Sequence, residues 1–280
     1  MKRVLVTGAG GFVGARVMEQ LGGRLHLICP PRGWMERAGL GDILNLMAET
    51  RPDAVLHLAA MSNTWACEQD PAASYRANVM LPLWIAQAAQ KRGTKLVAFS
   101  SDQVYAGVTQ EGSLSEDMPL SPSNVYGRHK LEAEQKILDA DPDAVLLRAT
   151  WMYDLPGYGL PAGSGLLLQL LRAGLRGDSL TFSSHDWRGV TYVRQAVENL
   201  IPALELPGGV YNYGSENDRD MLATARCFCQ ALGISVPLNE GDRARNLLMD
   251  TSKARQAGVV FDDTCAGIDR CLADYGLKKP

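Results

Sequence analysis

A tyrosine and a lysine lie four residues apart in the stretch SNVYGRHK, residues 123–130. Positions i and i+4 share one face of a helix, so Tyr126 and Lys130 can point into the same cleft. The reference pKa of tyrosine, about 10, is too high for ready proton exchange at neutral pH, and a nearby cation lowers it by stabilising the phenolate. The spacing therefore predicts a phenol that acts as an acid, with Lys130 as the group that tunes its pKa and also binds a cofactor ribose.

A serine supplies a third polar group near the end of a strand-like run. The apolar run KLVAFS, residues 95–100, leads directly into Ser101. Ligands of open α/β sheets lie beyond the carboxyl ends of the strands, so this serine is expected beside a bound substrate. Its hydroxyl would hydrogen-bond the substrate carbonyl oxygen that Tyr126 protonates.

A glycine-rich loop separates the first strand-like run from the first helical stretch. In VTGAGGFVGARV the glycines Gly8, Gly11 and Gly14 recur at every third position. The first permits a tight turn, the second lets the backbone approach a pyrophosphate, and the third lets the helix pack close to the strand. The loop therefore predicts a dinucleotide site that includes Phe12 and Val13, with a tight turn that binds nothing as the alternative.

The end of the second strand-like run bears on the choice of dinucleotide. An acidic residue at this place would bind the adenosine ribose of NAD, but the chain reads Cys29-Pro30-Pro31-Arg32. Arg32 is a candidate partner for a 2′-phosphate, which favours NADP(H) over NAD(H). A solvated loop arginine is the equal alternative.

The elements that must position these residues alternate between strand and helix. Apolar runs at 2–7, 24–29, 54–59, 95–100 and 144–147 are separated by helical stretches, among them 40–50, 72–92 and 126–140. This alternation predicts a Rossmann-type doubly wound α/β fold with a parallel sheet covered on both faces. The glycine-rich segment 155–165 predicts a surface loop where the chain leaves the sheet. We expect a dinucleotide-binding domain over 1–150, with a return segment near 186–211, and a smaller substrate-binding lobe, mainly over 151–280.

Composition, charge and cysteine spacing exclude several classes of protein. The chain has 280 residues, of which 46% are hydrophobic and 21% charged, as in ordinary soluble domains. A net charge of −3 without a basic block argues against nucleic acid or an anionic membrane as partner. Neither a signal peptide nor a membrane-spanning run is recognised, so a cytoplasmic protein is expected. The six cysteines form no CxxC pair, which predicts reduced thiols and no metal site.

The glycine loop, the serine and the Tyr-x-x-x-Lys pair together resemble the extended short-chain dehydrogenase/reductase superfamily. The resemblance covers nearly the whole chain and is greatest with dTDP-4-dehydrorhamnose reductase and similar nucleotide-sugar reductases. The stretches that carry it are SSDQVYAG, PLSPSNVYGRHKLEAE, LRATWMYD and LLMDTSKARQAG. They resemble, in turn, that family's serine strand end, catalytic helix, crossover into the sugar lobe and cleft-closing segment.

The resemblance implies roles for further residues. Asn78 matches the helix asparagine of an Asn-Ser-Tyr-Lys set that holds a water or a backbone group in a proton relay, with an ordinary helix residue as the alternative. The pair Asp42 and Ile43 would flank the adenine. In HLAA, Ala59 and Ala60 would lie along the cofactor, whereas His57 is expected in the core. On the substrate side the implied residues are Ser101, Asp102, Trp151 and Tyr153, although both aromatic residues could belong to the core.

Departures from the family pattern lie mostly on the substrate side. A family Asp-Gln pair reads Asp186-Trp187, and Trp65 replaces an expected acidic residue. We expect an NAD(P)H-dependent reductase of a 4-keto-6-deoxy nucleotide sugar with Tyr126 as general acid. An NAD-dependent nucleotide-sugar epimerase or dehydratase, and a non-catalytic NADP-binding regulatory subunit, are the alternatives. The resemblance also leaves a homodimer open.

Overall fold

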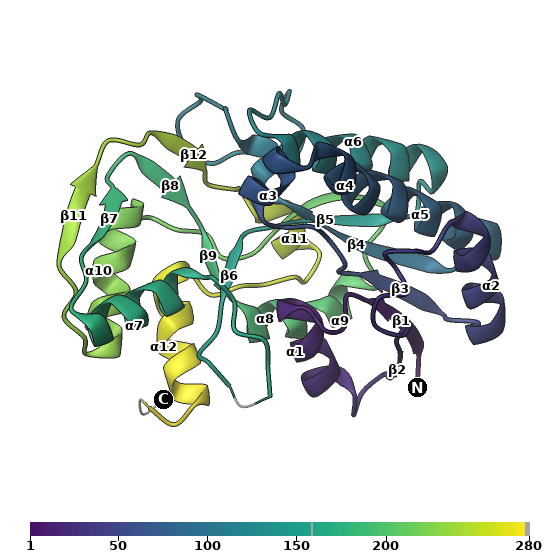
Figure 1. The fold of residues 1–280 in the computed structure, drawn as a ribbon, viewed down its shortest axis with the longest axis horizontal. Coiled ribbons are helices and arrows are strands. Elements are labelled where there is room, and N and C mark those ends of the chain that lie inside the picture. The colour runs from purple at the N-terminus through teal and green to yellow at the C-terminus, as the bar shows by residue number, and fades with distance from the viewer. Residues whose placement is uncertain (158, 278–280) are drawn as a thin grey trace.

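The computed structural model describes residues 1–157 and 159–277, so position 158 of the expected loop 155–165 lies outside the described residues. A six-stranded sheet forms the core of one lobe, on the right in Figure 1. Its strand order is β10-β5-β4-β3-β1-β2, and every neighbouring pair runs parallel. The strands are β1 (Arg3–Thr7), β2 (His26–Ile28), β3 (Ala54–His57), β4 (Lys95–Ser101), β5 (Val145–Ala149) and β10 (Gly209–Tyr213).

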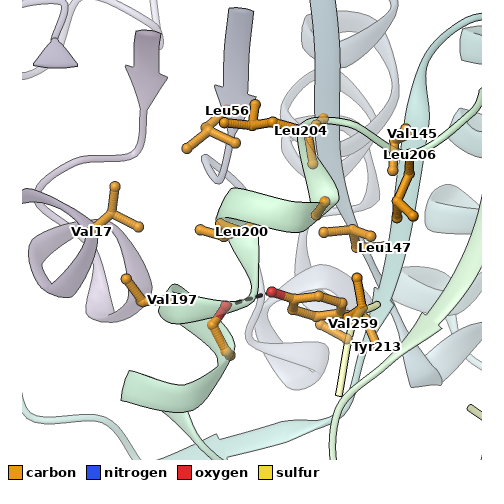
Figure 2. Packing of buried hydrophobic residues seen from close by; sticks show 14 of the residues in the cluster. Val17, Leu56, Val145, Leu147, Val197, Leu200, Leu204, Leu206, Tyr213 and Val259 are labelled. Atoms are coloured by element: carbon orange, nitrogen blue, oxygen red, sulfur yellow. Dashed lines mark hydrogen bonds between the residues drawn. The ribbon is translucent and has the colours of Figure 1, made fainter. Parts of the chain in front are cut away.

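Helices cover both faces of this sheet. Along β1, Val4 and Val6 face one hydrophobic cluster and Leu5 faces another, because successive side chains of a strand point to opposite faces. The first cluster packs against α1 (Phe12–Leu21), α8 (Val193–Glu198) and α9 (Leu200–Ala203), and the second against α2 (Leu40–Thr50), α5 (Leu81–Arg92) and α6 (Val125–Ala140). Figure 2 shows Val17, Val197 and Leu200 reaching toward the strand residues Leu56 and Leu147. The predicted doubly wound α/β fold is therefore confirmed.

The helix expected over residues 72–92 is present but changes its winding. It consists of α4 (Pro71–Tyr75), a π-helical segment (Arg76–Met80) and α5. The preceding loop contains the short α3 (Thr64–Gln69). A π turn inside a helix often marks a functional position, and Asn78 lies in this one.

In the described part of the chain, the second lobe, on the left in Figure 1, contains two-stranded parallel pairs and several helices. The pair β6 (Trp151–Tyr153) and β9 (Val190–Tyr192) lies between the lobes, and β7 (Leu180–Ser183) pairs with β11 (Leu238–Gly241). The pair β8 (Asp186–Arg188) and β12 (Arg245–Leu247) faces the first lobe. The helices are α7 (Leu166–Arg176), α10 (Met221–Leu232) and α12 (Thr264–Asp274). The chain returns to the sheet through α8, α9 and β10, and the short α11 (Ser252–Gln256) contacts β10.

The cysteines differ from the prediction at one pair. Cys227 on α10 and Cys265 on α12 form a disulfide, so the prediction of reduced thiols is wrong for these two residues. Their contact arises from the packing of α10 against α12, which the spacing of cysteines along the chain does not reveal. Within residues 1–157 and 159–277, no helix combines the length and apolarity required to cross a bilayer.

Candidate active site

The glycine loop joins β1 to α1 with no space for side chains at two of its positions. Gly8 has a φ of 73°, and a Cβ there would lie 2.7 Å from the backbone nitrogen of Ala59. A Cβ on Gly14 would lie 2.1 Å from the carbonyl oxygen of Gly8. Among the described residues, none caps α1 through its side chain, so the first amides of the helix remain available to an anionic ligand. This geometry fits a pyrophosphate.

The loop forms one wall of a cleft of about 820 Å³ at the carboxyl ends of the sheet strands. Open α/β sheets bind their ligands at this edge. Residues from both lobes line the cleft. The first lobe contributes Gly8, Gly11, Phe12, Val13, Gly14, Ala60, Ser101, Asp102, Tyr126 and Lys130, and the second contributes Trp151, Met152, Gly163, Ser164, Gly165, Arg188, Arg243 and Arg245.

Three residues predicted to bind the adenosine end are not among the described residues that line this cleft. Arg32 is exposed in the turn after β2 and, of the residues described, is not one that lines the cleft. The Asp42 carboxylate accepts a hydrogen bond from the amide of Gly39 at 2.9 Å and so closes the first turn of α2. Ile43 is 2% exposed and packs in the core beneath α2. The acidic–hydrophobic pair thus starts and anchors a helix.

The start of α6 is fixed by two side chains. Asn124 accepts a hydrogen bond from the amide of Gly127 at 2.7 Å, and Glu68 accepts one from the amide of Val125 at 2.7 Å. Gly127 also permits a close approach, because a Cβ there would lie 2.2 Å from the carbonyl oxygen of Gln103. The helix therefore begins directly against the segment that follows β4, which brings Tyr126 to Ser101.

Ser101, Tyr126 and Lys130 meet in the cleft. Burial raises the pKa of the Tyr126 phenol, the Asp102 carboxylate raises it further, and a hydrogen bond with Ser101 lowers it. Lys130 Nζ lies 6.0 Å from the centre of the Tyr126 ring and donates to the Phe99 carbonyl at 2.6 Å. Burial, opposed by the charge of Glu134, lowers the pKa of Lys130 to about 8. Lys130 was predicted to lower the pKa of the phenol, but in this arrangement burial dominates and keeps Tyr126 protonated.

Asn78 holds the backbone of the segment that follows β3. Its Oδ1 accepts from the amide of Met61 at 3.1 Å, and its Nδ2 donates to the Met61 carbonyl at 3.0 Å and to Ser74 Oγ at 3.1 Å. The side chain is 1% exposed. Asn78 therefore anchors the chain beside Ala60. His57 is a core histidine as expected, because its Nδ1 pairs with Thr7 Oγ1 at 2.7 Å and burial lowers its pKa to about 3.

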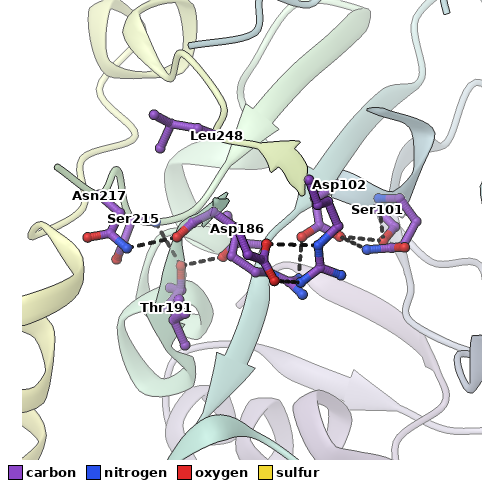
Figure 3. Close-up of polar contacts among 12 residues, drawn as sticks. Ser101, Asp102, Asp186, Thr191, Ser215, Asn217 and Leu248 are labelled. Carbon is purple, nitrogen blue, oxygen red and sulfur yellow. Dashed lines mark hydrogen bonds and ion pairs between the residues drawn. The ribbon is translucent and has the colours of Figure 1, made fainter. Parts of the chain in front are cut away.

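The wall of the cleft that the second lobe forms contains Arg188, Arg243 and Arg245, which were not predicted from the sequence. Arg188 pairs with Asp102, and Arg245 Nε donates to Asp186 at 2.8 Å. Figure 3 shows Asp102, which follows β4, near Asp186 on β8, so these two ion pairs lie beside each other where the lobes meet. Arg243 and Arg245, in the stretch GDRARN, precede the segment LLMDTSKARQAG that resembles the family's cleft-closing segment. Two arginines at alternate positions of a strand-like run were the available signal.

The two aromatic residues predicted to border the sugar lie in different surroundings. Trp151 lines the cleft, with the guanidinium carbon of Arg188 5.0 Å from its ring centre. Tyr153 is 1% exposed and packs edge-on against Phe228, with ring centres 5.0 Å apart, in the core of the second lobe. The placement of Tyr153 at the sugar is therefore not supported. The alternation of side chains along a strand places Trp151 and Tyr153 on the same face, so it could not reveal the difference. Tyr153 is buried because α7 and α10 pack around the end of β6.

A parallel six-stranded sheet, a three-residue glycine repeat and a Ser-Tyr-Lys cluster define the extended short-chain dehydrogenase/reductase class. The chain matches the model of the RmlD substrate binding domain over residues 1–260, and it belongs to that family. The resemblance drawn from the sequence is confirmed at this level.

Curated relatives cover most of the chain. The spore coat polysaccharide biosynthesis protein SpsK of Bacillus subtilis is 28% identical over 213 residues, which covers 76% of this chain and 73% of SpsK. The dTDP-4-dehydrorhamnose reductase of Aggregatibacter actinomycetemcomitans is 24% identical and covers 77% and 74%. The UDP-glucose 4-epimerase of Lactobacillus helveticus is also similar, at 24% identity and 90% of each chain.

Solved structures share the fold at low sequence identity. The dTDP-4-dehydrorhamnose reductase of Bacillus anthracis in complex with NADP superposes with a TM-score of 0.87 over 98% of this chain and 99% of that chain, at 20% identity. The Thermus thermophilus UDP-glucose 4-epimerase in complex with NAD gives a TM-score of 0.79 over 98% and 99%, at 21% identity.

Proposed function

We propose that this protein is an NAD(P)H-dependent reductase of a 4-keto-6-deoxy nucleotide sugar. The observation that carries the proposal is the meeting of Ser101, Tyr126 and Lys130 in a cleft between the glycine loop and the arginines of the second lobe. Membership of the RmlD family and the reductases among the relatives support the same reaction class.

The cofactor wall is formed by backbone. Gly8, Gly11 and Gly14 would receive the pyrophosphate, with the first amides of α1 facing it. A bound nicotinamide supplies the hydride. The NADP in the Bacillus anthracis structure favours NADP(H), and the NAD in the Thermus thermophilus structure keeps NAD(H) as the second choice. Arg32 remains the proposed partner of a 2′-phosphate, since its side chain is exposed after β2.

The proton chemistry rests on the buried phenol. Because burial keeps Tyr126 protonated at neutral pH, it can donate to a carbonyl oxygen as hydride reaches the carbonyl carbon. Ser101 supplies a second hydrogen bond to that oxygen. Preorganised donors aimed at developing negative charge stabilise such transition states. Lys130 is positively charged below about pH 8 and would bind a ribose hydroxyl.

The substrate side offers charge and one aromatic face. Arg188, Arg243 and Arg245 line the cleft together with Trp151. Guanidinium groups bind phosphate oxygens through paired hydrogen bonds, so these arginines suit the diphosphate of a nucleotide sugar. Trp151 is the proposed platform for the sugar ring.

An NAD-dependent epimerase is a second candidate, because an epimerase relative matches 90% of the chain. The test is the decay of NADPH and NADH absorbance with purified protein and dTDP-4-keto-6-deoxy-L-mannose, beside Tyr126→Phe. Decay that requires both the sugar and Tyr126 is the expected result. Conversion of UDP-glucose to UDP-galactose without net loss of cofactor would replace the reductase by an epimerase. Cofactor binding without any conversion of either sugar would contradict both candidates.

A further inference from the structure

Arg16 forms a deeply buried ion pair between the two lobes. It lies on α1, one helical turn beyond Phe12, and its side chain is 1% exposed. Its Nε donates to Asp154 Oδ2 at 2.7 Å, and the side chain of Asp154 is 0% exposed. Since Asp154 directly follows β6, the pair joins the first helix of the nucleotide-binding lobe to the chain that enters the second lobe. Separation of such a pair would leave a buried charge without a partner, which strongly favours one arrangement of the two segments.

The same guanidinium also holds the glycine-rich segment that follows. Arg16 Nη1 donates to the carbonyl oxygens of Phe12 and Pro161, both at 2.9 Å. Two residues beyond Pro161, the chain packs closely on Phe12, because a Cβ on Gly163 would lie 2.9 Å from Phe12 Cε2. The guanidinium carbon of Arg16 lies 4.2 Å from the centre of the same ring. Arg16 thus fixes both Phe12 and residues 161–163.

Asp154 is held by further donors. Its Oδ1 accepts from the hydroxyl of Tyr275 at 3.0 Å and from the amide of Leu155 at 2.9 Å. Arg194 Nε lies 3.7 Å from Oδ2. The carboxylate is therefore fixed in the orientation that receives Arg16, and the C-terminal helix region takes part in the same contact.

We propose that Arg16 and Asp154 are positioning residues for the dinucleotide cofactor. They hold residues 161–165 against the glycine loop, where Gly163, Ser164, Gly165 and Phe12 line the cleft together. A segment with glycines at 163 and 165 has high backbone entropy when it is unrestrained. The ion pair orders this segment before the cofactor arrives, so that ordering does not oppose binding. The role concerns the cofactor alone and does not depend on the identity of the sugar.

The test compares cofactor affinity with local order in Arg16→Met/Asp154→Leu. This double variant removes both charges, so neither is left buried without its partner. The dissociation constant for NADPH, measured by fluorescence titration, is expected to rise about tenfold or more. Hydrogen exchange of the amides at 162–165 should become faster at the same time. An unchanged dissociation constant together with unchanged exchange in the folded double variant would overturn the proposal.

Two further variants separate positioning from general stability. Val17 lies on the same helix, is fully buried and faces the sheet core. Val17→Ala should therefore lower the free energy of unfolding while the affinity for NADPH stays within about twofold. Arg16→Lys keeps the charge but loses the planar fork that reaches Asp154, Phe12 and Pro161 at once. It should weaken NADPH binding even if the double variant does not fold. If Arg16→Lys binds NADPH as tightly as the wild type, or if Val17→Ala weakens binding equally, Arg16 has no positioning role.

Discussion

The two walls of the cleft are built by different means. The wall proposed for the cofactor consists largely of backbone and small residues, and at Gly8 and Gly14 a single Cβ would collide with neighbouring main chain. The wall proposed for the substrate consists of long charged side chains: Arg188 on β8, Arg243 in the loop before β12, and Arg245 on β12. A ligand that is recognised by backbone requires glycine at fixed spacing, whereas a ligand recognised by side chains can be served from several elements. The first wall therefore leaves a motif in the sequence and the second does not.

The largest expected effect falls between the walls, at Tyr126→Phe. Loss of the proton donor should lower turnover by about 10²–10⁴-fold, because general acid catalysis contributes on that scale. NADPH affinity should change little, since the ring remains in place. Steady-state rates and NADPH titration of the same preparation check both statements. A variant that retains more than about a tenth of the wild-type turnover would contradict the assignment of Tyr126 as the acid.

On the cofactor wall, Gly14→Ala should abolish tight NADPH binding. Its Cβ would lie 2.1 Å from the Gly8 carbonyl oxygen, so α1 must move away from the loop. A displacement of about 1 Å at such a site can cost about 100-fold in function. Gly10→Ala is the matched control, because within the described part of the chain a Cβ there meets no atom within 4 Å. Equal NADPH affinity in the two variants would show that the loop does not bind the cofactor as proposed.

On the substrate wall, Arg245→Met should raise the KM for the nucleotide sugar by about tenfold, the effect of roughly 1.4 kcal/mol of lost interaction. The KM for NADPH should stay constant, because Arg245 lies across the cleft from the glycine loop. Arg255→Met is the control, since Arg255 forms an exposed pair with Glu216. The KM values for the sugar and for NADPH, measured on the same preparations, show which of the two ligands Arg245 binds. A change in the NADPH KM alone would reverse the assignment of the two walls.

The smallest effect is a pH dependence that arises from Lys130. Its pKa in the folded protein is lowered to about 8, so kcat/KM should fall to about half at pH 8 and further above it as the charge is lost. The free energy of unfolding should change in the opposite direction. The unfolded chain, with a lysine pKa of about 10.4, binds more protons between pH 8 and 10.4, so this residue's contribution to stability rises with pH there. Rate profiles and urea melts of wild type and Lys130→Met measure both, and a wild-type rate that is constant from pH 7 to 10 would exclude this role for Lys130.

The sequence predicted the fold and the tight glycine loop because both depend largely on local patterns. Binding of the cofactor at that loop stays a prediction. Alternating apolar runs specify a parallel sheet, and Gly14 is required by a contact within the β1–turn–α1 unit, where its Cβ would meet the Gly8 carbonyl oxygen. The arginines escaped prediction because only tertiary structure brings β8 and β12 together beside Asp102. The contact between Cys227 and Cys265 has the same origin. Asp42 and Tyr153 show the opposite error. Both match the residue types of a binding site, but Asp42 closes the first turn of α2 and Tyr153 packs in the core.

The position of β10 in the chain has a consequence for synthesis. This strand pairs with β5, yet residues 150–208, which include much of the second lobe, separate the two in the sequence. A ribosome that adds about 5–20 residues per second leaves the edge of β5 uncovered for several seconds before β10 emerges. An unpaired strand edge is a template for association with other chains. The nascent protein therefore passes through an interval in which chaperone capture of the growing sheet competes with aggregation, and a fragment that ends near residue 150 would remain in that exposed state.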